Sequence, residues 1–236
     1  MKNLKVVTWN CNGALRKKYQ FLDQFDADVY VIQECENPLE CIQSDYTNWA
    51  KNHLWIGDSK NKGLGVFAKE NIKLEVLDWP NVYNDHSVKH FLPCLINGNT
   101  QFIAVWAHSN NSPTFGYIGQ FWKYLQLHKS KFNEIIIAGD FNSNSRWDRW
   151  WNHSDVIREL KEINIESFYH LYFYERSGKE QQPTFFLQRN LQKPYHIDYV
   201  FGSSFFKNKL NKVEIGKIEE WLLLSDHLPM FCEFTD

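Results

Sequence analysis

Short runs of apolar, often β-branched residues recur along the chain, and polar residues follow them. The first run, residues 6–9, ends in the polar stretch 10–13, and the second, residues 29–32, ends at Gln33 and Glu34. Runs of this length and composition predict buried β-strands that present polar side chains at their ends. The same pattern predicts further strands at residues 63–67, 91–96, 102–107, 135–138, 197–201 and 230–234.

Apolar residues at intervals of three or four predict helices in three other segments. These stripes lie at residues 15–25, 118–125 and 156–163. We expect Ser154 to cap the third helix, with Asp155 in its first turn. Because the first helix connects two predicted strands, the chain is expected to begin with a strand, a helix and a second strand.

The composition indicates a large folded core. Hydrophobic residues make up 43% of the 236 positions and aromatic residues 17%, including ten Trp and eighteen Phe. The chain has no internal repeat, low-complexity tract or linker. We therefore predict a single domain over residues 1–236.

Charge and cysteine usage narrow the class of protein. A net charge of -2 and a pI of about 6.5 provide no overall basic field, so contact with nucleic acid has to come from a local patch or a metal. The five cysteines are odd in number and lack ligand spacing, which predicts free thiols. No segment approaches the roughly 18 apolar residues of a membrane span, and the first residues lack a signal-peptide pattern. We predict a cytoplasmic protein with no membrane association and no evident obligate protein partner.

Acidic, amide or imidazole side chains stand at or beside one end of five predicted strands. Burial of an isolated carboxylate is costly, so such a collection at strand ends implies a metal ion or a dense polar network. Carboxylate and amide oxygens suit Mg²⁺ or Mn²⁺ rather than zinc. The residues concerned are Asn10, Asn12, Glu34, His108, Asp140, Asn142, Asp226 and His227.

Six short motifs run in order along nearly the whole chain, from residue 9 to residue 229. They read WNCNG, IQE, AHS, GDFN, IDYVF and SDHLP. In this set and order the sequence resembles the endonuclease/exonuclease/phosphatase superfamily, which includes exonuclease-type apurinic endonucleases and pancreatic deoxyribonuclease. The resemblance implies an α/β fold, a four-layer α/β/β/α sandwich of two mixed sheets with flanking helices.

The resemblance also implies a divalent-metal site that holds Mg²⁺ or Mn²⁺. Glu34 corresponds to the principal metal carboxylate, and Asn10 and Asn12 bind the metal or orient the phosphate. Asn12 matches the bacterial exonuclease-type members, whereas an aspartate there would place more charge on the metal. Asp226 is expected to lie close to the metal.

The catalytic roles are likewise carried over from the family. Asp140 orients or deprotonates the attacking water, and Asn142 donates to the phosphate. His227 is the essential histidine at the scissile phosphate, and Asp198 holds the tautomer of its imidazole and raises its basicity. His108 stands where deoxyribonuclease-like members have a histidine and apurinic endonucleases a tyrosine. In-line displacement at phosphorus needs a metal, donors to the phosphate oxygens and a water-activating base. These residues include ligands for the metal, such donors and such a base.

Arginine and tryptophan alternate directly after the GDFN motif. Arg146 and Arg149 stand among Trp147, Trp150 and Trp151, a composition suited to base stacking and phosphate contact. We predict that this segment binds substrate. The alternative is that the tryptophans anchor a loop or a helix start in the core.

Tyr195 and His196 precede Asp198, and their position relative to apurinic endonucleases implies that they line the substrate cleft. Ordinary structural roles stay open at several of these positions. Asn10 and Asn12 before a glycine are typical of a turn, and Asp198 has Lys193 or His196 as an alternative structural partner.

Three functions stay open from the sequence. The first is a nuclease that hydrolyses DNA or RNA backbone phosphates, favoured by the short chain, the double-asparagine WNCNG start and the lack of large insertions. The second is a phosphatase or phosphodiesterase for a small ester such as an inositol phosphate, nucleotide or lipid headgroup, favoured by the near-neutral charge, although the inositol-phosphatase signature PAWTDR is missing. The third is a non-catalytic relative that binds RNA, against which the intact Glu34, Asp140 and His227 argue.

Overall fold

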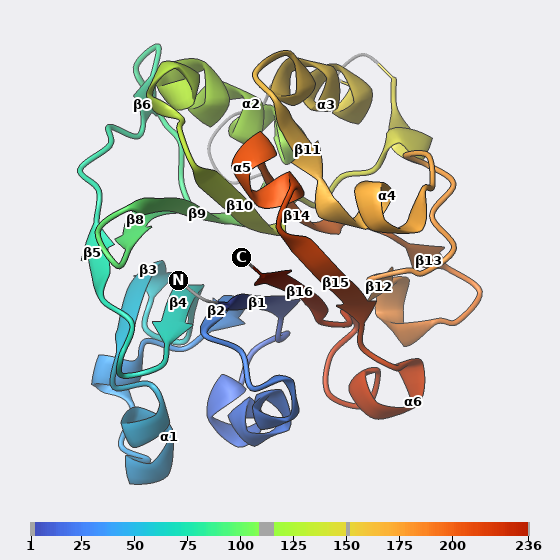
Figure 1. Cartoon of the computed structure of the whole chain (residues 1–236). Helices are drawn as coiled ribbons and strands as arrows, with labels where there is room; N and C mark the ends of the chain where they lie inside the picture. The colour runs from blue at the N-terminus through green and yellow to red at the C-terminus, as the bar shows by residue number, and fades with distance from the viewer. Residues whose placement is uncertain (1–2, 109–115, 150–151, 236) are drawn as a thin grey trace.

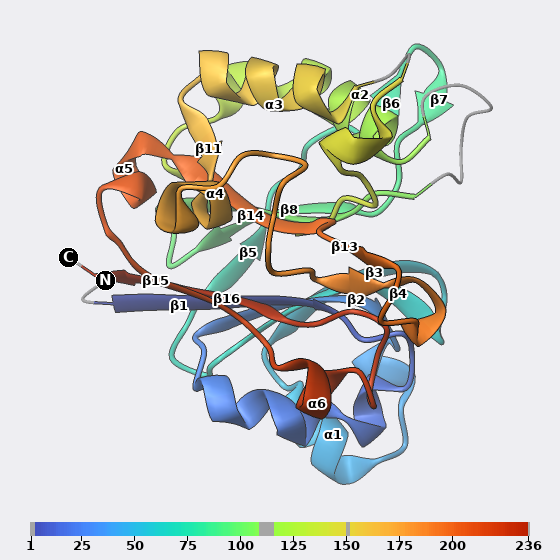
Figure 2. The same ribbon diagram turned by 90° about the vertical axis from the view of Figure 1, so that its right-hand side faces the viewer.

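The computed structural model describes residues 3–108, 116–149 and 152–235. Two mixed sheets pack face to face, and helices cover the outer side of each (Figures 1 and 2). Helices α2 (Ile118–His128) and α3 (His153–Glu162) lie on one side, and α1 (Ser44–Trp49) and α6 (Ile218–Trp221) on the other. The predicted four-layer α/β/β/α sandwich is confirmed.

The first sheet combines strands from the two ends of the chain. Its central pair, β1 with β2, is parallel, and every other neighbouring pair is antiparallel. Because β1 lies between β2 and the last strand, segments from both ends of the chain are needed to complete this sheet. In spatial order its strands are β15 (Leu210–Ile215), β16 (Met230–Thr235), β1 (Asn3–Asn10), β2 (Val29–Cys35), β4 (Lys62–Ala68) and β3 (His53–Ser59).

The second sheet repeats this pairing pattern. Its central pair, β9 with β10, is parallel, and antiparallel strands flank it on both sides. The strands β1 and β10 thus hold equivalent places in the two sheets. In spatial order the strands are β11 (Ile165–Ser167), β14 (Asp198–Ser203), β10 (Ile135–Asp140), β9 (Thr100–Trp106), β8 (Phe91–Ile96) and β5 (Leu74–Val76).

Shorter elements connect and border the sheets. Two small hairpins are formed by β6 (Val82–Tyr83) with β7 (His86–Ser87) and by β12 (Phe185–Phe186) with β13 (Pro194–Tyr195). The remaining helices are α4 (Phe168–Phe173), α5 (Ser204–Lys207) and the 3-10 helices η1 (Leu15–Lys17), η2 (Tyr19–Phe25), η3 (Pro38–Glu40), η4 (Lys129–Lys131), η5 (Ser145–Trp147) and η6 (Leu187–Arg189).

Side-chain alternation along the central strands divides the core. On β1, Val6 is buried in the core between the sheets, whereas Trp9 points outward and packs edge-on against Trp221 of α6. On β10, Ile136 belongs to the core between the sheets and Ile137 to the layer under α2 and α3. Because alternate strand residues face opposite sides, the side chain at each strand end points either into the sandwich or away from it.

Residues 15–25 do not form the single helix that their apolar spacing predicts. The structure has two 3-10 helices there, separated at Lys18, whose backbone (φ -130°, ψ -15°) is not helical. The Lys18 ammonium donates to the carbonyl of Cys11 over 2.7 Å, so the segment folds back onto the end of β1. The apolar residues Leu15 and Leu22 are nevertheless buried, as a helix would also bury them.

Ser154 is not the N-cap of α3, so that prediction was wrong. The cap position is Asn152, and the Asp148 carboxylate accepts hydrogen bonds from the backbone N–H groups of His153 and Ser154. An acceptor from the preceding turn therefore satisfies the free donors of the first helical turn. Asp155 does lie in that first turn, as predicted.

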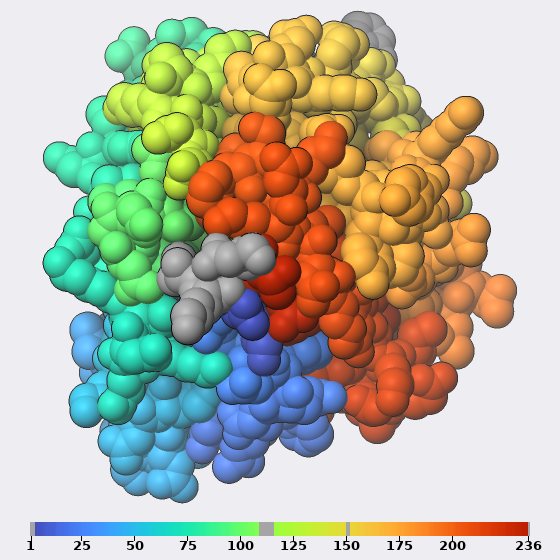
Figure 3. Space-filling view, in the orientation of Figure 1, coloured from blue at the N-terminus to red at the C-terminus, as the bar shows by residue number. Residues whose placement is uncertain are grey.

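Both ends of the described chain lie at one face of the molecule. In Figure 3 the blue start of β1 and the red C-terminal segment meet at the centre of that face. The register agrees, because Asn3 pairs with Thr235. Strand β1 therefore runs away from this face, and its polar end at Asn10 lies at the opposite rim.

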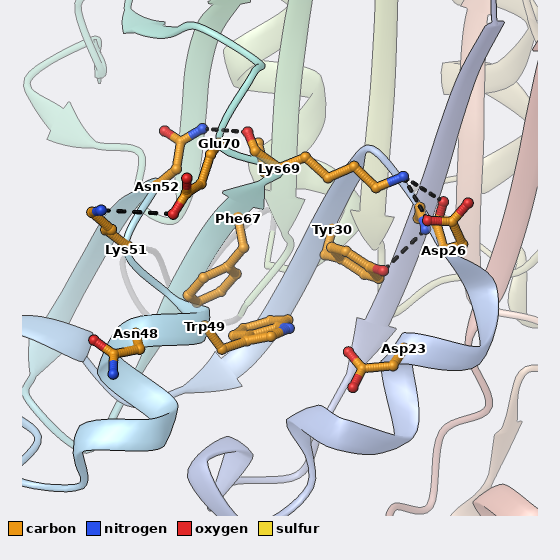
Figure 4. A pocket seen from close by; sticks show the side chains of 12 residues that line it. Asp23, Asp26, Tyr30, Asn48, Trp49, Lys51, Asn52, Phe67, Lys69 and Glu70 are labelled. Atoms are coloured by element: carbon orange, nitrogen blue, oxygen red, sulfur yellow. Dashed lines mark hydrogen bonds and ion pairs between the residues drawn. The ribbon is translucent and has the colours of Figure 1, made fainter.

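A hollow of about 310 Å³ lies on the outer side of the first sheet, beside the start of β2. Figure 4 shows the rings of Tyr30, Trp49 and Phe67 in it. It is separate from the rim at which β1 and β2 end. Four of the charged side chains around it form two ion pairs, Lys51 with Glu70 and Lys69 with Asp26.

All five cysteines are free, as predicted. Burial raises the pKa of Cys94 to about 12 and shifts the pKa of Cys11, Cys35 and Cys232 in the same direction. These thiols are therefore protonated and unreactive near neutral pH. Within the described ranges, no helix is long and apolar enough to cross a membrane.

Candidate active site

The ends of β1 and β10 meet between the sheets. Asn10 is 2% exposed and Asp140 is fully buried, and both side chains lie on the inner faces of their sheets. The Asn10 side-chain Nδ2 donates to Asp140 Oδ2 over 3.0 Å. A hydrogen bond between two buried polar groups at equivalent strand ends thus links the two sheets at this rim.

A β-bulge turns Glu34 toward the same point. On β2, Gln33 pairs with Leu64 and Cys35 with Gly63, so Glu34 is an extra residue without a partner on β4. Its φ of +62° is in the left-handed region, which a non-glycine residue rarely adopts. A bulge of this kind redirects a side chain, and here the Asn10 Nδ2 lies 3.4 Å from Glu34 Oε1.

The Asp140 carboxylate accepts hydrogen bonds from two asparagines. Besides Asn10, the backbone N–H of Asn142 donates to Oδ1 over 2.8 Å and its Nδ2 to Oδ2 over 2.9 Å. The preceding Gly139 has φ +155°, and a Cβ there would lie 1.9 Å from the carbonyl oxygen of Val105. Only glycine fits that close approach, which explains the first residue of the GDFN motif.

Two carboxylates face each other across the second sheet. Asp140 and Asp198 are direct partners in the antiparallel pairing of β10 with β14. Burial, together with the neighbouring Asp198 charge, raises the pKa of Asp140 to about 7. Opposed like charges destabilise a sheet unless a cation offsets them, and His227 lies beside the pair.

His227 supplies that cation. Its Nδ1 is 2.9 Å from Asp198 Oδ2 and 3.2 Å from Oδ1. Burial by itself lowers the pKa of the imidazole, but the Asp198 carboxylate outweighs it and raises the pKa to about 9. Ligand atoms of Asp140, Asp198 and His227 all lie within 4.8 Å of one another.

The backbone around His227 is held from both sheets. Trp9 Nε1 donates to the His227 carbonyl over 3.0 Å, and the His227 N–H donates to Ser225 Oγ over 3.0 Å. The Ser225 hydroxyl itself donates to the Asn10 carbonyl over 2.7 Å. On the other side, the Thr184 carbonyl accepts from the Leu228 N–H over 2.7 Å, and Thr184 Oγ1 accepts from the backbone N–H of Asp198 in the second sheet over 3.1 Å.

Asn12 and Asp226 extend the site toward solvent. The Asn12 backbone N–H donates to Asn10 Oδ1 and its Nδ2 donates to Asp226 Oδ1, each over 3.0 Å. Asn12 has φ +52°, so the turn that the NxNG pattern predicts does form. In this protein the turn and the site are the same feature, because the turn is what brings Asn12 to Asp226.

His108 lies at the edge of the site, with an intermediate exposure. Burial lowers its pKa, while the nearby Glu34 carboxylate acts in the opposite direction. Its Nδ1 is buried and has no hydrogen-bond partner in the described part of the chain. Ser109 of the same motif lies outside the described residues.

The predicted substrate-binding residues are exposed or half-buried, except for the buried His196. The guanidinium of Arg146 lies 5.6 Å from the centre of the Tyr195 ring, and the centres of the Trp147 and Tyr195 rings are 4.7 Å apart. Arg146 and Trp147 are exposed, as is Arg149. The core-anchoring alternative therefore does not apply to Trp147, whereas Trp150 and Trp151 lie outside the described residues.

The burial of His196 contradicts the prediction that its side chain lines the substrate cleft. Its side chain is 2% exposed, its ring packs 4.2 Å from that of Tyr169, and its Nδ1 lies 2.8 Å from the Gln182 carbonyl. Burial lowers its pKa to about 4, so the ring is neutral near pH 7. His196 directly follows β13, and its side chain turns into the interior beside Tyr169, whereas Tyr195 is half-buried.

The sequence patterns missed two residues that lie at the site. Lys62 Nζ is 2.9 Å from Glu34 Oε2, and the Phe185 ring lies 4.6 Å from that of His227. Neither residue belongs to a motif. Only the β2–β4 pairing and a bridge between Phe185 and His227 bring them there.

The donor set fits a hard divalent cation. Glu34 and Asp226 offer carboxylate oxygens, and Asn10 and Asn12 offer amide oxygens. The Lys62 ammonium on Glu34 indicates that this carboxylate attracts a cation. The buried group of Asp140, Asp198 and His227 is a second possible ligand cluster in the described part of the chain.

A model of the Endonuclease/Exonuclease/phosphatase family matches residues 7–227. The chain belongs to this family. Members of the endonuclease/exonuclease/phosphatase family are phosphoester hydrolases that use divalent metals, so the chain is a phosphoester hydrolase by family. The predicted resemblance is thus confirmed, while no curated protein matches the chain.

Solved structures share the family fold at low sequence identity. A 3' phosphatase from Neisseria bound to a product DNA hairpin is 15% identical, with a TM-score of 0.71 over 99% of this chain and 100% of that one. An AP endonuclease from Archaeoglobus fulgidus is 17% identical, with a TM-score of 0.69 over 98% and 99%. D. rerio TDP2 complexed with single strand DNA product is 14% identical, with a TM-score of 0.62 over the whole of both chains. These likenesses establish the fold.

Proposed function

We propose that the protein is a divalent-metal-dependent nuclease that hydrolyses DNA or RNA backbone phosphates by in-line attack of an activated water. The observation that carries the proposal is the convergence of Asp140, Asp198 and His227 within 4.8 Å, next to the Glu34 carboxylate. These residues come from both sheets. Catalysis at phosphorus needs a base, a donor to the phosphate and a cation, and this rim has groups suited to each.

Asp140 is the proposed group that orients and deprotonates the water. A carboxyl whose pKa lies near 7 is well matched to accept a proton near neutral pH. Imidazolium His227, held by Asp198, donates to a phosphate oxygen. Asn142 positions Asp140, since its backbone N–H and its Nδ2 both donate to that carboxylate. His108, which lies at the edge of the site with an intermediate exposure, is proposed as a further donor to the phosphate.

Glu34, Asn10, Asn12 and Asp226 are the proposed ligands of the metal, Mg²⁺ or Mn²⁺. When bound, the ion neutralises charge that develops on the phosphate and leaving oxygens. The protein keeps the ligand oxygens of these four residues at one rim, and the bulge at Glu34 and the turn at Asn12 do this.

Nucleic acid is the proposed substrate because aromatic rings lead outward from the site. The centres of the Phe185 and His227 rings are 4.6 Å apart, those of Phe185 and Tyr195 6.3 Å, and those of Tyr195 and Trp147 4.7 Å. Aromatic rings beside an arginine such as Arg146 provide stacking for bases and charge for phosphates. Structural neighbours with bound DNA, the Neisseria 3' phosphatase and TDP2, support the same class of substrate.

A small phosphate ester is the second candidate substrate. The net charge of -2 favours it, since a protein for long polyanions usually carries a basic field.

A reducing, cytoplasmic location is proposed from the five free cysteines.

Turnover of a defined panel tests the proposal. The panel contains nicked, abasic and intact duplex DNA, single-stranded DNA, RNA, and inositol and nucleotide phosphates, each with Mg²⁺ or Mn²⁺. Cleavage of a polynucleotide that disappears with EDTA and in His227→Ala supports a nuclease. Turnover of small esters alone would select the second candidate, and no metal-dependent turnover of any substrate would refute both.

A further inference from the structure

Lys62 and Glu34 form an ion pair at the centre of the proposed metal site. The ammonium Nζ is 2.9 Å from Glu34 Oε2, and the two side chains are 52% and 18% exposed. Lys62 is the first residue of β4, directly after the two-residue turn that follows β3. The pair therefore joins a hairpin edge to the carboxylate that the metal is proposed to use.

The fold places this ammonium next to Glu34. Gly63 pairs with Cys35, so Lys62 stands one residue from the bulge at which Glu34 lies. The Lys62 Nζ also lies 5.7 Å from the centre of the Trp106 ring, a distance typical of a cation–π contact. The ammonium thus has two anchors, one on each sheet, and the indole keeps it near the site when the carboxylate is engaged elsewhere.

A divalent cation and an ammonium compete for one carboxylate. Each satisfies the negative charge of Glu34, and two cations held a few ångströms apart repel. Lysine is suited to exchange partners because its ammonium is a compact charge with rotatable donors on a flexible stem.

We propose that Lys62 holds Glu34 in the metal-free protein, that a divalent cation displaces it, and that the released ammonium then binds a phosphate oxygen of the substrate. This inference rests on the proposed function. The site would then pass between two neutralised states, one with Lys62 on Glu34 and one with the metal there and Lys62 on the phosphate. The carboxylate would never be left without a cation.

Metal binding without substrate tests the first half. Mn²⁺ titration by calorimetry compares the wild type with Lys62→Met, Lys60→Met and Glu34→Gln. Removal of the competitor should tighten Mn²⁺ binding in Lys62→Met by about two- to fivefold, the effect of a partly exposed ion pair. Lys60 precedes it in the same turn, is exposed, and its side chain has no partner in the described ranges, so Lys60→Met controls for the loss of one positive charge.

Substrate binding tests the second half. At saturating Mn²⁺, Lys62→Met should raise KM by about three- to tenfold and change kcat by a smaller factor, as loss of one charged contact to phosphate does. Lys62→Arg should restore most of the KM, because it keeps the charge. A Lys62→Met variant with wild-type KM would overturn this half.

The outcomes separate the inference from the proposed function. Suppose that Mn²⁺ binds the wild type, that its affinity is lower in Glu34→Gln, and that Lys62→Met binds it no more tightly than Lys60→Met does. Competition between Lys62 and the metal is then refuted, and the metal site stands. If the wild type and Glu34→Gln both fail to bind Mn²⁺, the proposed function and the inference are overturned together.

Discussion

The side-chain amide of Asn10 donates to the carboxylate of Asp140 over 3.0 Å, and this hydrogen bond joins the central strands of the two sheets. The same amide nitrogen is 3.4 Å from Glu34 Oε1. Asn10 therefore links the proposed water-activating group to the proposed metal carboxylate. Its backbone carbonyl also accepts a hydrogen bond from the hydroxyl of Ser225, the residue that precedes Asp226 and His227.

Asn10→Ala should lower kcat/KM by about 10- to 100-fold, the usual cost of removing a group that orients metal ligands. The reason is that Asp140 and Glu34 lose their common donor. Steady-state kinetics, with Tm as a check on folding, measure this. Asn211→Ala is the control, because it removes an exposed amide-to-carboxylate bond to Glu233. Equal activity of the two variants would contradict a linking role for Asn10.

Asp198→Asn should lower kcat by about 10²- to 10⁴-fold with a smaller change in KM. The asparagine keeps the shape of the side chain but not the charge that stabilises the His227 imidazolium. Single-turnover rates at saturating substrate measure the effect. Asp155→Asn, which alters an exposed ion pair to Arg158 on α3, should leave the rate unchanged. A rate within threefold of wild type would remove Asp198 from the mechanism.

Joint substitution of Arg146 and Arg149 by alanine should weaken nucleic-acid binding and reduce the slope of log affinity against log salt by about 1 to 2. Both side chains are exposed, so Tm should not fall. Fluorescence anisotropy over a salt series measures both affinity and slope. Arg158→Ala on the outer helix α3 is the control. Unchanged Michaelis constants in the double variant would rule out a substrate contact.

Glu180 should make the fold acid-sensitive. Its side chain is 2% exposed, and although burial raises its pKa, hydrogen bonds from His170 and the Gly178 N–H lower the pKa to about 2. The folded pKa lies below the unfolded value of about 4.3, so the stabilisation of about 3 kcal/mol is complete above pH 4.3 and is lost as pH falls toward 2.

Glu180→Gln tests this by urea unfolding between pH 7 and pH 2.5. The free energy of unfolding should be lower than that of the wild type at pH 7, and the difference should shrink as the pH falls below about 4.3. Glu219→Gln removes an exposed carboxylate and serves as the control. A difference that does not vary with pH would show that the Glu180 charge is not what stabilises the fold.

Local patterns determined much of the architecture. Period-two and continuous apolar runs predicted the central strands β1, β2, β9, β10, β14 and β16, since burial on both faces selects such residues whatever their neighbours. Edge strands and short hairpins carry weaker patterns and were not predicted. The stripe at residues 15–25 indicated burial correctly but not helix type, because the tie from Lys18 to Cys11 is a contact with another part of the fold.

Which chemical groups stand at strand ends could be predicted from the amino-acid order, because polar residues that follow an apolar strand are recognisable in a linear sequence. Which of these groups come into contact depends on the three-dimensional fold. Glu34 turns inward through a bulge against β4, Asp198 faces Asp140 through strand register, and Lys62 and Phe185 reach the site from segments without a motif. His196 is buried against Tyr169, a contact with another segment of the chain. Register, bulges and sheet order arise from long-range pairing, and no local pattern encodes them.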